Sequence, residues 1–168
     1  MSVFGWIVVH QNVGDGFDWD LFWLDYKFGF GEISSNFWLG LERLHLLTLS
    51  QNYRLRMEVE ISSGGWYSAE YWYFLVGDES SRYQLTADDY EGDAGNAMQR
   101  NGLSGKHDGM KFSTPDFDND DDLGVHCAGN AAGGWWFDHC YDVCITCMTS
   151  HSYMNMALQT SRMMIKPW

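Results

Sequence analysis

Apolar and polar side chains alternate strictly over residues 53–61, where the sequence is YRLRMEVEI. Because successive side chains of a β-strand point to opposite faces of its sheet, this alternation predicts a strand with one buried and one exposed face. The buried face would carry Tyr53, Leu55, Met57, Val59 and Ile61. Residues 68–77 and 81–87, which are joined by the turn sequence GDES, predict the next two strands.

Helical spacing replaces this alternation in two places. In residues 39–50, apolar side chains recur every three or four positions, which predicts a short helix. Another helix is predicted within residues 14–32, where Asp18 is placed to cap the first turn and Gly29 to end the helix. From residue 88 onward the chain is rich in Gly, Asp and Asn and has little periodicity, which predicts loops that begin with a solvated acidic turn. Together the patterns predict an α+β fold, with an antiparallel sheet, short helices and a loop-built C-terminal region.

The length and composition of the chain predict one domain with a core rich in aromatic rings. A chain of 168 residues is long enough for one domain with a substantial core. Its content of 45% hydrophobic and 17% aromatic residues excludes a disordered acidic tail. Most tryptophans are expected to be packing residues, namely Trp19, Trp23, Trp38, Trp66 and Trp72.

The net charge of the chain limits the kinds of partner that it can bind. Ten Lys and Arg residues stand against 23 Asp and Glu residues, so the net charge is −13. Nucleic acid is therefore a poor partner, because phosphate binding needs a basic surface, and anionic membranes are disfavoured for the same reason. No apolar run has the length of a membrane span, and the first twelve residues lack the basic start of a signal peptide. No serine-nucleophile motif or phosphate-binding loop indicates an enzyme.

All four cysteines lie close together near the C-terminus, at positions 127, 140, 144 and 147. An even number of cysteines is typical of disulfides, for which three connectivities are possible. The spacing of Cys144 and Cys147 also suits zinc, with His126, His139 or His151 as further ligands. Free thiols are the third possibility.

Residues 116–124 (DFDNDDDLG) form the most acidic stretch of the chain, and no Lys or Arg lies between Lys111 and Arg162. The stretch does not fit the EF-hand, because Gly at position 6 and Glu at position 12 are missing in either register. Two interpretations remain at this point. The loop is solvated and tolerates its own repulsion, or side chains and carbonyls at two-residue spacing wrap a divalent cation.

The segments around this loop resemble the fibrinogen C-terminal domain family. The sequence GMKFSTPDFDNDDD (109–122) and the following CAGNAAGGWWFDHC (127–140) carry the resemblance most clearly. Similar segments precede them in the order of the family. They are GWIVVHQ (5–11), FWLDYKFGFGE (22–32), NFWLGLERLHLLT (36–48), YRLRMEVE (53–60), AEYWYFLVGDESSRYQL (69–85) and YEGDAGNAM (90–98).

The resemblance implies a calcium site in the acidic loop. Its matching positions are the carboxylates of Asp118 and Asp120, with Asp122 and Gly124 as carbonyl donors. Asp116 would support the loop instead of binding the ion. A bound Ca²⁺ ion would then account for the concentration of negative charge.

The resemblance also implies a disulfide between Cys127 and Cys140, which closes the loop that forms one wall of the ligand pocket. The matching ligand-binding residues are Trp136, His139, Cys140 and Tyr141. In the family the peptide before the second cysteine is often cis, here His139–Cys140. The pocket of the family binds acetyl groups, acidic sugars or peptide N-termini, depending on the member.

The match is uneven along the single domain expected over residues 1–168. Residues 5–143 match well, residues 144–162 are atypical, and residues 163–168 resemble the terminal strand. The lectin members have His where this chain has Tyr141, and the Asn-Leu-Asn-Gly segment that follows in the family is absent. The chain thus resembles a domain truncated at its N-terminus and lacking a C-terminal segment.

The resemblance favours a secreted, calcium-dependent recognition domain of the ficolin and tachylectin type that binds acetylated or other glycans. The alternative is a protein–protein interaction or polymerisation module, as in fibrinogen, angiopoietins and tenascins, with extracellular protein ligands. A third possibility is an inactive fragment. A homo-oligomer formed through an upstream segment is expected in either active case.

Overall fold

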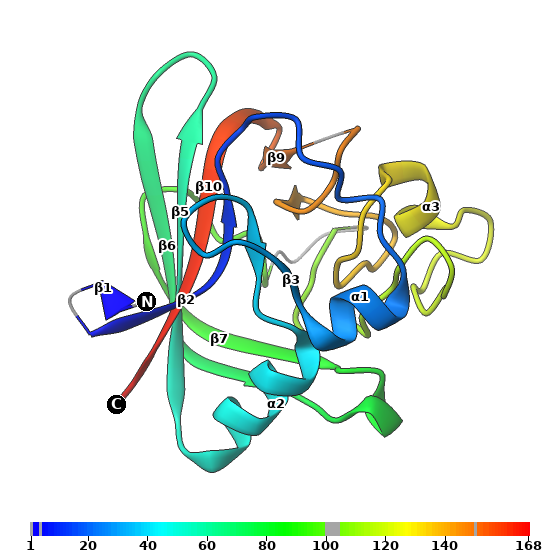
Figure 1. Cartoon of the computed structure of the whole chain (residues 1–168), viewed down its shortest axis with the longest axis horizontal. Coiled ribbons are helices and arrows are strands. Elements are labelled where there is room, and N and C mark those ends of the chain that lie inside the picture. The colour runs from blue at the N-terminus through cyan, green and yellow to red at the C-terminus, as the bar shows by residue number, and fades with distance from the viewer. Residues whose placement is uncertain (1, 4, 100–104, 150) are drawn as a thin grey trace.

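The computed structural model describes residues 2–3, 5–99, 105–149 and 151–168. An antiparallel sheet forms its centre, with the strand order β3-β4-β2-β10-β5-β6-β7 (Figure 1). The strands on this path are β2 (Trp6–Asn12), β3 (Phe30–Gly31), β4 (Phe37–Trp38), β5 (Tyr53–Ile61), β6 (Trp66–Val76), β7 (Leu85–Gly92) and β10 (Met156–Pro167). The short strands β1 (Ser2–Val3), β8 (Val143–Cys144) and β9 (Ser152–Tyr153) lie off it. With the helices α1 (Trp23–Phe28), α2 (Leu41–Ser50) and α3 (Cys127–Ala131), this architecture confirms the predicted α+β class.

The last strand of the chain lies in the middle of the sheet. β10 pairs with β2 on one side and with β5 on the other, so that Met163 faces both His10 and Met57. Met163, Met164 and Ile165 are buried, which fixes the strand between its two neighbours. The terminal strand expected at 163–168 therefore exists, but it begins at Met156 and includes part of the segment expected to be atypical.

The alternation over residues 53–61 has the predicted consequence. Tyr53, Leu55, Met57 and Val59 are buried, and the residues between them are half-exposed on the other face. The helices α1 and α2 and the loops of residues 105–149 lie on the buried side of the sheet (Figure 1). α2 is tied to it by the hydroxyl of Thr48, which accepts a hydrogen bond from the amide of Val76 at 3.1 Å.

The N-terminus of α1 differs from the prediction. The helix begins at Trp23, and Asp18 does not cap it. Instead the amide of Trp23 donates to Oδ1 of Asp116 at 2.9 Å, so the carboxylate comes from a segment 93 residues away. A local capping pattern could not reveal a partner so distant in sequence. Gly29 ends the helix as predicted, with a φ of 92° that favours glycine.

β7 also lies elsewhere than predicted. The 3₁₀ helix η1 (Glu79–Ser81) occupies the start of the segment expected as a strand, and β7 begins at Leu85. Asp88, Asp89 and Glu91 therefore belong to this strand and not to a solvated turn. Because β7 is the last strand of the sheet, these charges oppose its pairing with a foreign strand.

Aromatic rings form much of the core. The buried set includes Trp19, Trp23, Trp38, Trp135, Trp136, Tyr26 and Phe112. Trp66 does not join it, since 57% of its surface is exposed. The packing role expected for Trp66 is thus wrong, because this end of β6 has no layer against it on the outer side.

A buried histidine connects the loops that follow the sheet. Nδ1 of His107 donates to the carbonyl of Trp136 at 2.6 Å, and Nε2 accepts from the amide of Val143 at 3.2 Å. Burial lowers the pKa of His107 to about 4, so the ring is neutral and one nitrogen is free to accept. Loops without regular structure are thereby joined to the core. In the described part of the chain, no helix has the length and apolar character that a membrane crossing requires.

Candidate calcium and ligand site

The acidic loop is wound by hydrogen bonds between residues two apart. Oδ1 of Asp118 accepts from the amide of Asp120 at 3.3 Å, and Oδ1 of Asp120 accepts from the amide of Asp122 at 3.0 Å. Oδ1 of Asp122 accepts from the amide of Gly124 at 2.9 Å. These bonds are Asx turns, in which a short carboxylate side chain binds its own backbone. The aspartates that recur every second residue in the sequence thus form a repeated turn in the folded loop.

Two side chains anchor this loop to the preceding segment. The amide of Asn119 donates to Oγ of Ser113 at 2.9 Å, and its side-chain nitrogen donates to the carbonyl of Phe112 at 2.9 Å. Oδ1 of Asp116 accepts from the hydroxyl of Thr114 at 2.8 Å in addition to the amide of Trp23. Asp116 therefore ties the loop to α1.

The surroundings of Asp120, including the carboxylate of Asp118, raise the pKa of Asp120. Burial raises the pKa of Asp120, backbone amides of Cys127 and Asp122 oppose the rise, and the carboxylate of Asp118 adds to it. A carboxylate with a raised pKa is one whose charge is poorly compensated by its surroundings. A cation held between the two groups would supply the missing compensation.

The chemistry of the donors fits calcium better than a soft metal. Among the described residues, the one group of three metal-ligating side chains is Asp122 with Cys127 and Cys140. The two sulfur atoms are bonded to each other, so neither is a thiolate that could bind a metal. The acidic loop offers the carboxylates of Asp118, Asp120 and Asp122, and oxygen donors of this kind are those that Ca²⁺ prefers.

The cysteines form two disulfides, so none of the four is a thiolate that could bind zinc. Cys127 is bonded to Cys140, and Cys144 is bonded to Cys147. Both bonds lie where helices and strands are short, since α3 begins at Cys127 and β8 ends at Cys144. A disulfide constrains the unfolded chain, so each bond stabilises this loop region.

The first disulfide places the acidic loop directly beside the expected ligand wall. The amide of Cys127 donates to Oδ2 of Asp120 at 2.9 Å. The amide of Asp121 donates to the carbonyl of Asp138 at 3.3 Å. The loop at Asp120 is therefore connected to Cys140 through Cys127 and its disulfide.

Three of the four expected ligand residues lie at the surface. His139 is exposed, and its Nδ1 lies 2.8 Å from Oδ1 of Asp138, whose hydrogen bond raises the pKa of the histidine. Tyr141 is half-buried and packs on the ring of Phe137 at 5.6 Å between centroids. Cys140 has a φ of 66°, and its carbonyl accepts a hydrogen bond from the amide of Asp138 at 3.2 Å. The His139–Cys140 peptide is trans, so the cis bond expected there is not present.

Trp136, the fourth expected ligand residue, lies in the core and not at the surface. Its side chain is fully buried, and its indole N–H donates to the carbonyl of Tyr83 at 2.8 Å. Its ring also packs on Phe112 and Trp38. A ligand could reach Trp136 only by displacing the core.

Sequence reasoning missed the apolar tip of the loop. Leu123 is fully exposed, and Phe117 and Val125 are partly exposed beside the carboxylates. The signal was present in the sequence, because a leucine and a valine follow three consecutive aspartates. The site therefore combines negative charge with exposed apolar side chains.

Comparisons with known proteins agree with this geometry. Residues 2–167 match the family model described as "Fibrinogen beta and gamma chains, C-terminal globular domain". Techylectin-5A of Tachypleus tridentatus is 38% identical over 141 residues, which cover 82% of this chain and 46% of the relative. Fibroleukin of Bos taurus is 39% identical over 136 residues, which cover 81% of this chain and 31% of the relative. The chain thus spans less than half the length of either protein.

Solved structures show the same fold. The fibrinogen-like globe domain of human ANGPTL2 has a TM-score of 0.88 and 30% identity, covering 97% of this chain and 80% of that one. The lamprey fibrin D-dimer, complexed with the peptide Gly-His-Arg-Pro-amide, has a TM-score of 0.84 and 29% identity. The match covers 96% of this chain and 61% of the lamprey chain. These comparisons indicate a recognition domain and no enzyme family, and the chain belongs to the fibrinogen C-terminal domain family.

Proposed function

We propose that this chain is an extracellular recognition domain in which calcium at Asp118 and Asp120 supports a ligand-binding wall at residues 139–141. The observation that carries the proposal is the direct link between the two. Asp120 accepts a hydrogen bond from Cys127, and Cys127 is bonded to Cys140 in the wall. A cation that orders the loop would therefore order the wall.

Calcium would be held by four donors of the loop. The carboxylates of Asp118 and Asp120 supply negative charge, and the backbone carbonyls of Asp122 and Gly124 supply neutral oxygens. Waters would complete the six to eight ligands that the ion takes. The side chain of Asp122 is turned toward the disulfide, which supports a role for its carbonyl and not for its carboxylate.

The wall suits a small acetylated ligand, such as the acetamido group of a glycan. The amide of Cys140 can donate to the ligand carbonyl, and the ring of Tyr141 can cover the methyl group. Affinity for a single sugar would be about millimolar, because few contacts must offset the cost of association. Clustered copies of the domain, as in a homo-oligomer, would raise the effective affinity. Two disulfides support secretion, since such bonds persist in oxidising compartments.

The test is retention of the domain, displayed in clusters on streptavidin, by N-acetylglucosamine resin. Retention is expected with calcium and release with EDTA or free acetate. The variant Asp118→Ala with Asp120→Ala should pass through. The matched control is Asp18→Ala with Asp20→Ala, since these exposed aspartates have the same spacing and the same Asx turn at 3.0 Å. Equal behaviour of the two double variants would contradict the proposal.

A peptide ligand is the second candidate, and the exposed apolar tip of the acidic loop favours it. Leu123 and Val125 lie beside several carboxylates, which suits a basic peptide with apolar side chains. The lamprey fibrin D-dimer, a structural relative, is complexed with a peptide. Calorimetry with Gly-His-Arg-Pro-amide and with the same residues in scrambled order would distinguish this candidate. The peptide would be favoured over the glycan if Gly-His-Arg-Pro-amide binds, the scrambled peptide does not, and the variant Leu123→Ser no longer binds.

A further inference from the structure

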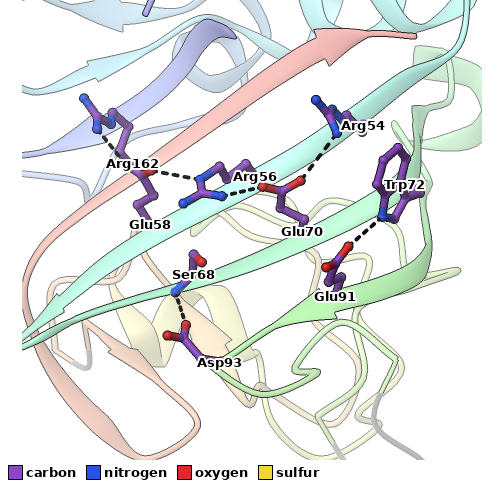
Figure 2. Close-up of polar contacts among 9 residues, drawn as sticks. All are labelled: Arg54, Arg56, Glu58, Ser68, Glu70, Trp72, Glu91, Asp93 and Arg162. Atoms are coloured by element: carbon purple, nitrogen blue, oxygen red, sulfur yellow. Dashed lines mark hydrogen bonds and ion pairs between the residues drawn. The ribbon is translucent and has the colours of Figure 1, made fainter. Parts of the chain in front are cut away.

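The outer face of the sheet carries a ladder of ion pairs. Arg162 of β10 contacts Glu58 of β5 at 2.5 Å, and Glu58 contacts Arg56 at 2.8 Å. Arg56 pairs in turn with Glu70 of β6, which lies 3.8 Å from Arg54. Figure 2 shows these side chains side by side across three neighbouring strands. The face is thus covered by planar charged groups with fixed positions.

Aromatic rings hold one end of this ladder. The guanidinium of Arg54 lies between the rings of Trp6 and Trp72, at 4.8 Å from each centroid. The indole N–H of Trp72 donates to Glu91 at 3.3 Å (Figure 2). Three arginines and three glutamates meet on this face. Each arginine of the ladder is thus paired with a carboxylate, and Glu60 and Asp93 add two further acidic groups beside the ladder.

Two hollows meet at the exposed ring of Trp66. The larger one, of about 460 Å³, is lined by Trp66, Arg56, Glu58, Asp93 and Arg162, among others. The smaller one, of about 260 Å³, shares Trp66 and Arg162 and adds residues such as Gln11 and Thr160. Together they form a groove across β6, β5, β10 and β2. The groove is separate from the acidic loop, which lies on the opposite side of the sheet (Figure 1).

The groove combines an open ring with groups that can bind hydroxyls. More than half of the Trp66 surface is exposed, and an indole face packs well against apolar C–H groups. Oδ1 of Asp93 accepts from the amide of Ser68 at 2.7 Å, which fixes the carboxylate and leaves its other oxygen able to accept. The guanidinium groups of Arg56 and Arg162 carry N–H groups that can donate hydrogen bonds to a ligand. Sugar rings present both kinds of surface, an apolar C–H face and hydroxyls that donate and accept.

We propose that this groove is a second ligand site, which binds a neutral oligosaccharide independently of calcium. Arg56 and Arg162 are already paired with Glu58 and Glu70, so they would have to give up these partners to bind a sulfate group, and a neutral ligand is favoured. A peptide adding as a strand is excluded, because β5, β6 and β10 already have neighbours on both sides. Trp66 forms the platform under one sugar ring. Arg56, Glu58, Asp93 and Arg162 bind its hydroxyls.

The test is a titration of the whole chain with cellotetraose, maltotetraose and mannotetraose, followed by the NMR signals of the backbone and indole N–H groups. These sugars lack acetyl groups, so they do not probe the wall at residues 139–141. At ~10 mM, above a millimolar Kd, at least one should shift the Trp66 indole signal and the amides of β5 and β6. EDTA should leave the shift unchanged.

The matched control for Trp66→Ala is Trp168→Ala, because Trp168 is exposed to a similar extent, 61%, and lies outside the groove. Trp66→Ala should weaken binding by about tenfold or more, as expected when an aromatic anchor is removed. Trp168→Ala and the variant Asp118→Ala with Asp120→Ala should bind as the wild type does. The proposal is overturned if none of the three sugars shifts these signals, if EDTA abolishes binding, or if the two tryptophan variants behave alike.

Discussion

Two regions of this chain concentrate charged side chains, the ladder on the outer face of the sheet and the acidic loop on the other side. In the ladder, Glu58 accepts from Arg56 and from Arg162. In the loop, Asp118 and Asp120 lie in a stretch of the sequence that has no Lys or Arg between positions 111 and 162. The first region balances its charge within the protein, and the second does not.

The pKa values of the two regions move in opposite directions. Burial would raise the pKa of Glu58, but hydrogen bonds from Arg162 and Arg56 outweigh it and hold the pKa below its ordinary value. Burial raises the pKa of Asp120, and its neighbour Asp118 raises it further. The comparison teaches that density of charge does not identify a cation site. What distinguishes the two regions is whether the carboxylates have arginine partners within the protein.

The largest effect is expected from the disulfide that supports the loop. Cys127→Ala with Cys140→Ala should lower the free energy of unfolding by ~3 kcal/mol, from the entropy of the closed loop in the unfolded chain. Chemical denaturation measures the loss. Hydrogen exchange should speed up in residues 116–141, whereas the amides of β5 should keep the protection of the wild type. Equal acceleration in β5 would show that the two regions do not differ in their dependence on the bond.

Calcium should stabilise the loop region next most strongly. An ion bound only by the folded state stabilises it by mass action, by about 2.7 kcal/mol at a concentration a hundredfold above Kd. Thermal unfolding with and without calcium measures the gain. It should vanish in Asp118→Ala with Asp120→Ala and persist in Glu58→Gln. Magnesium serves as the control cation, since it demands a tighter geometry.

Removing charge should have opposite signs in the two regions. Without calcium, Glu58→Gln should destabilise the protein by about 2 kcal/mol, because two arginines lose their negatively charged partner. Asp118→Asn with Asp120→Asn should stabilise it by up to about 1 kcal/mol, because the repulsion of two close charges is relieved. Denaturation in EDTA compares them. If both variants were less stable than the wild type, the ladder and the loop would not differ in the way proposed.

The smallest effect concerns the pH dependence of the ladder. Since the pKa of Glu58 is lowered in the folded state, its ion pairs contribute stability above its unfolded pKa of ~4.3. This contribution is lost as the pH falls through the folded value. The difference in stability between wild type and Glu58→Gln should therefore be constant near neutrality and shrink below pH ~4. Denaturation at a series of pH values tests it, with Glu60→Gln as the control on the same face.

Much of the fold could be predicted from the sequence, because the rules involved are local. The alternation over residues 53–61 fixed which side chains of β5 are buried, since the strand backbone itself turns them to opposite faces. Gly29 marked the end of α1 because its backbone conformation favours glycine. The two-residue spacing of Asp118, Asp120 and Asp122 likewise became a series of Asx turns.

Tertiary structure decided everything that depended on distant partners. Asp116 caps α1 across 93 residues, and β10 enters the sheet between strands formed far earlier in the chain. Trp136 is buried and Trp66 is exposed, although both are tryptophans in aromatic segments, because only the packed layers determine which side of the sheet is covered. Residue types and spacing determined the family, the acidic loop and the cysteine cluster. Long-range contacts decided which of these side chains remain open to a ligand, since no local pattern records them.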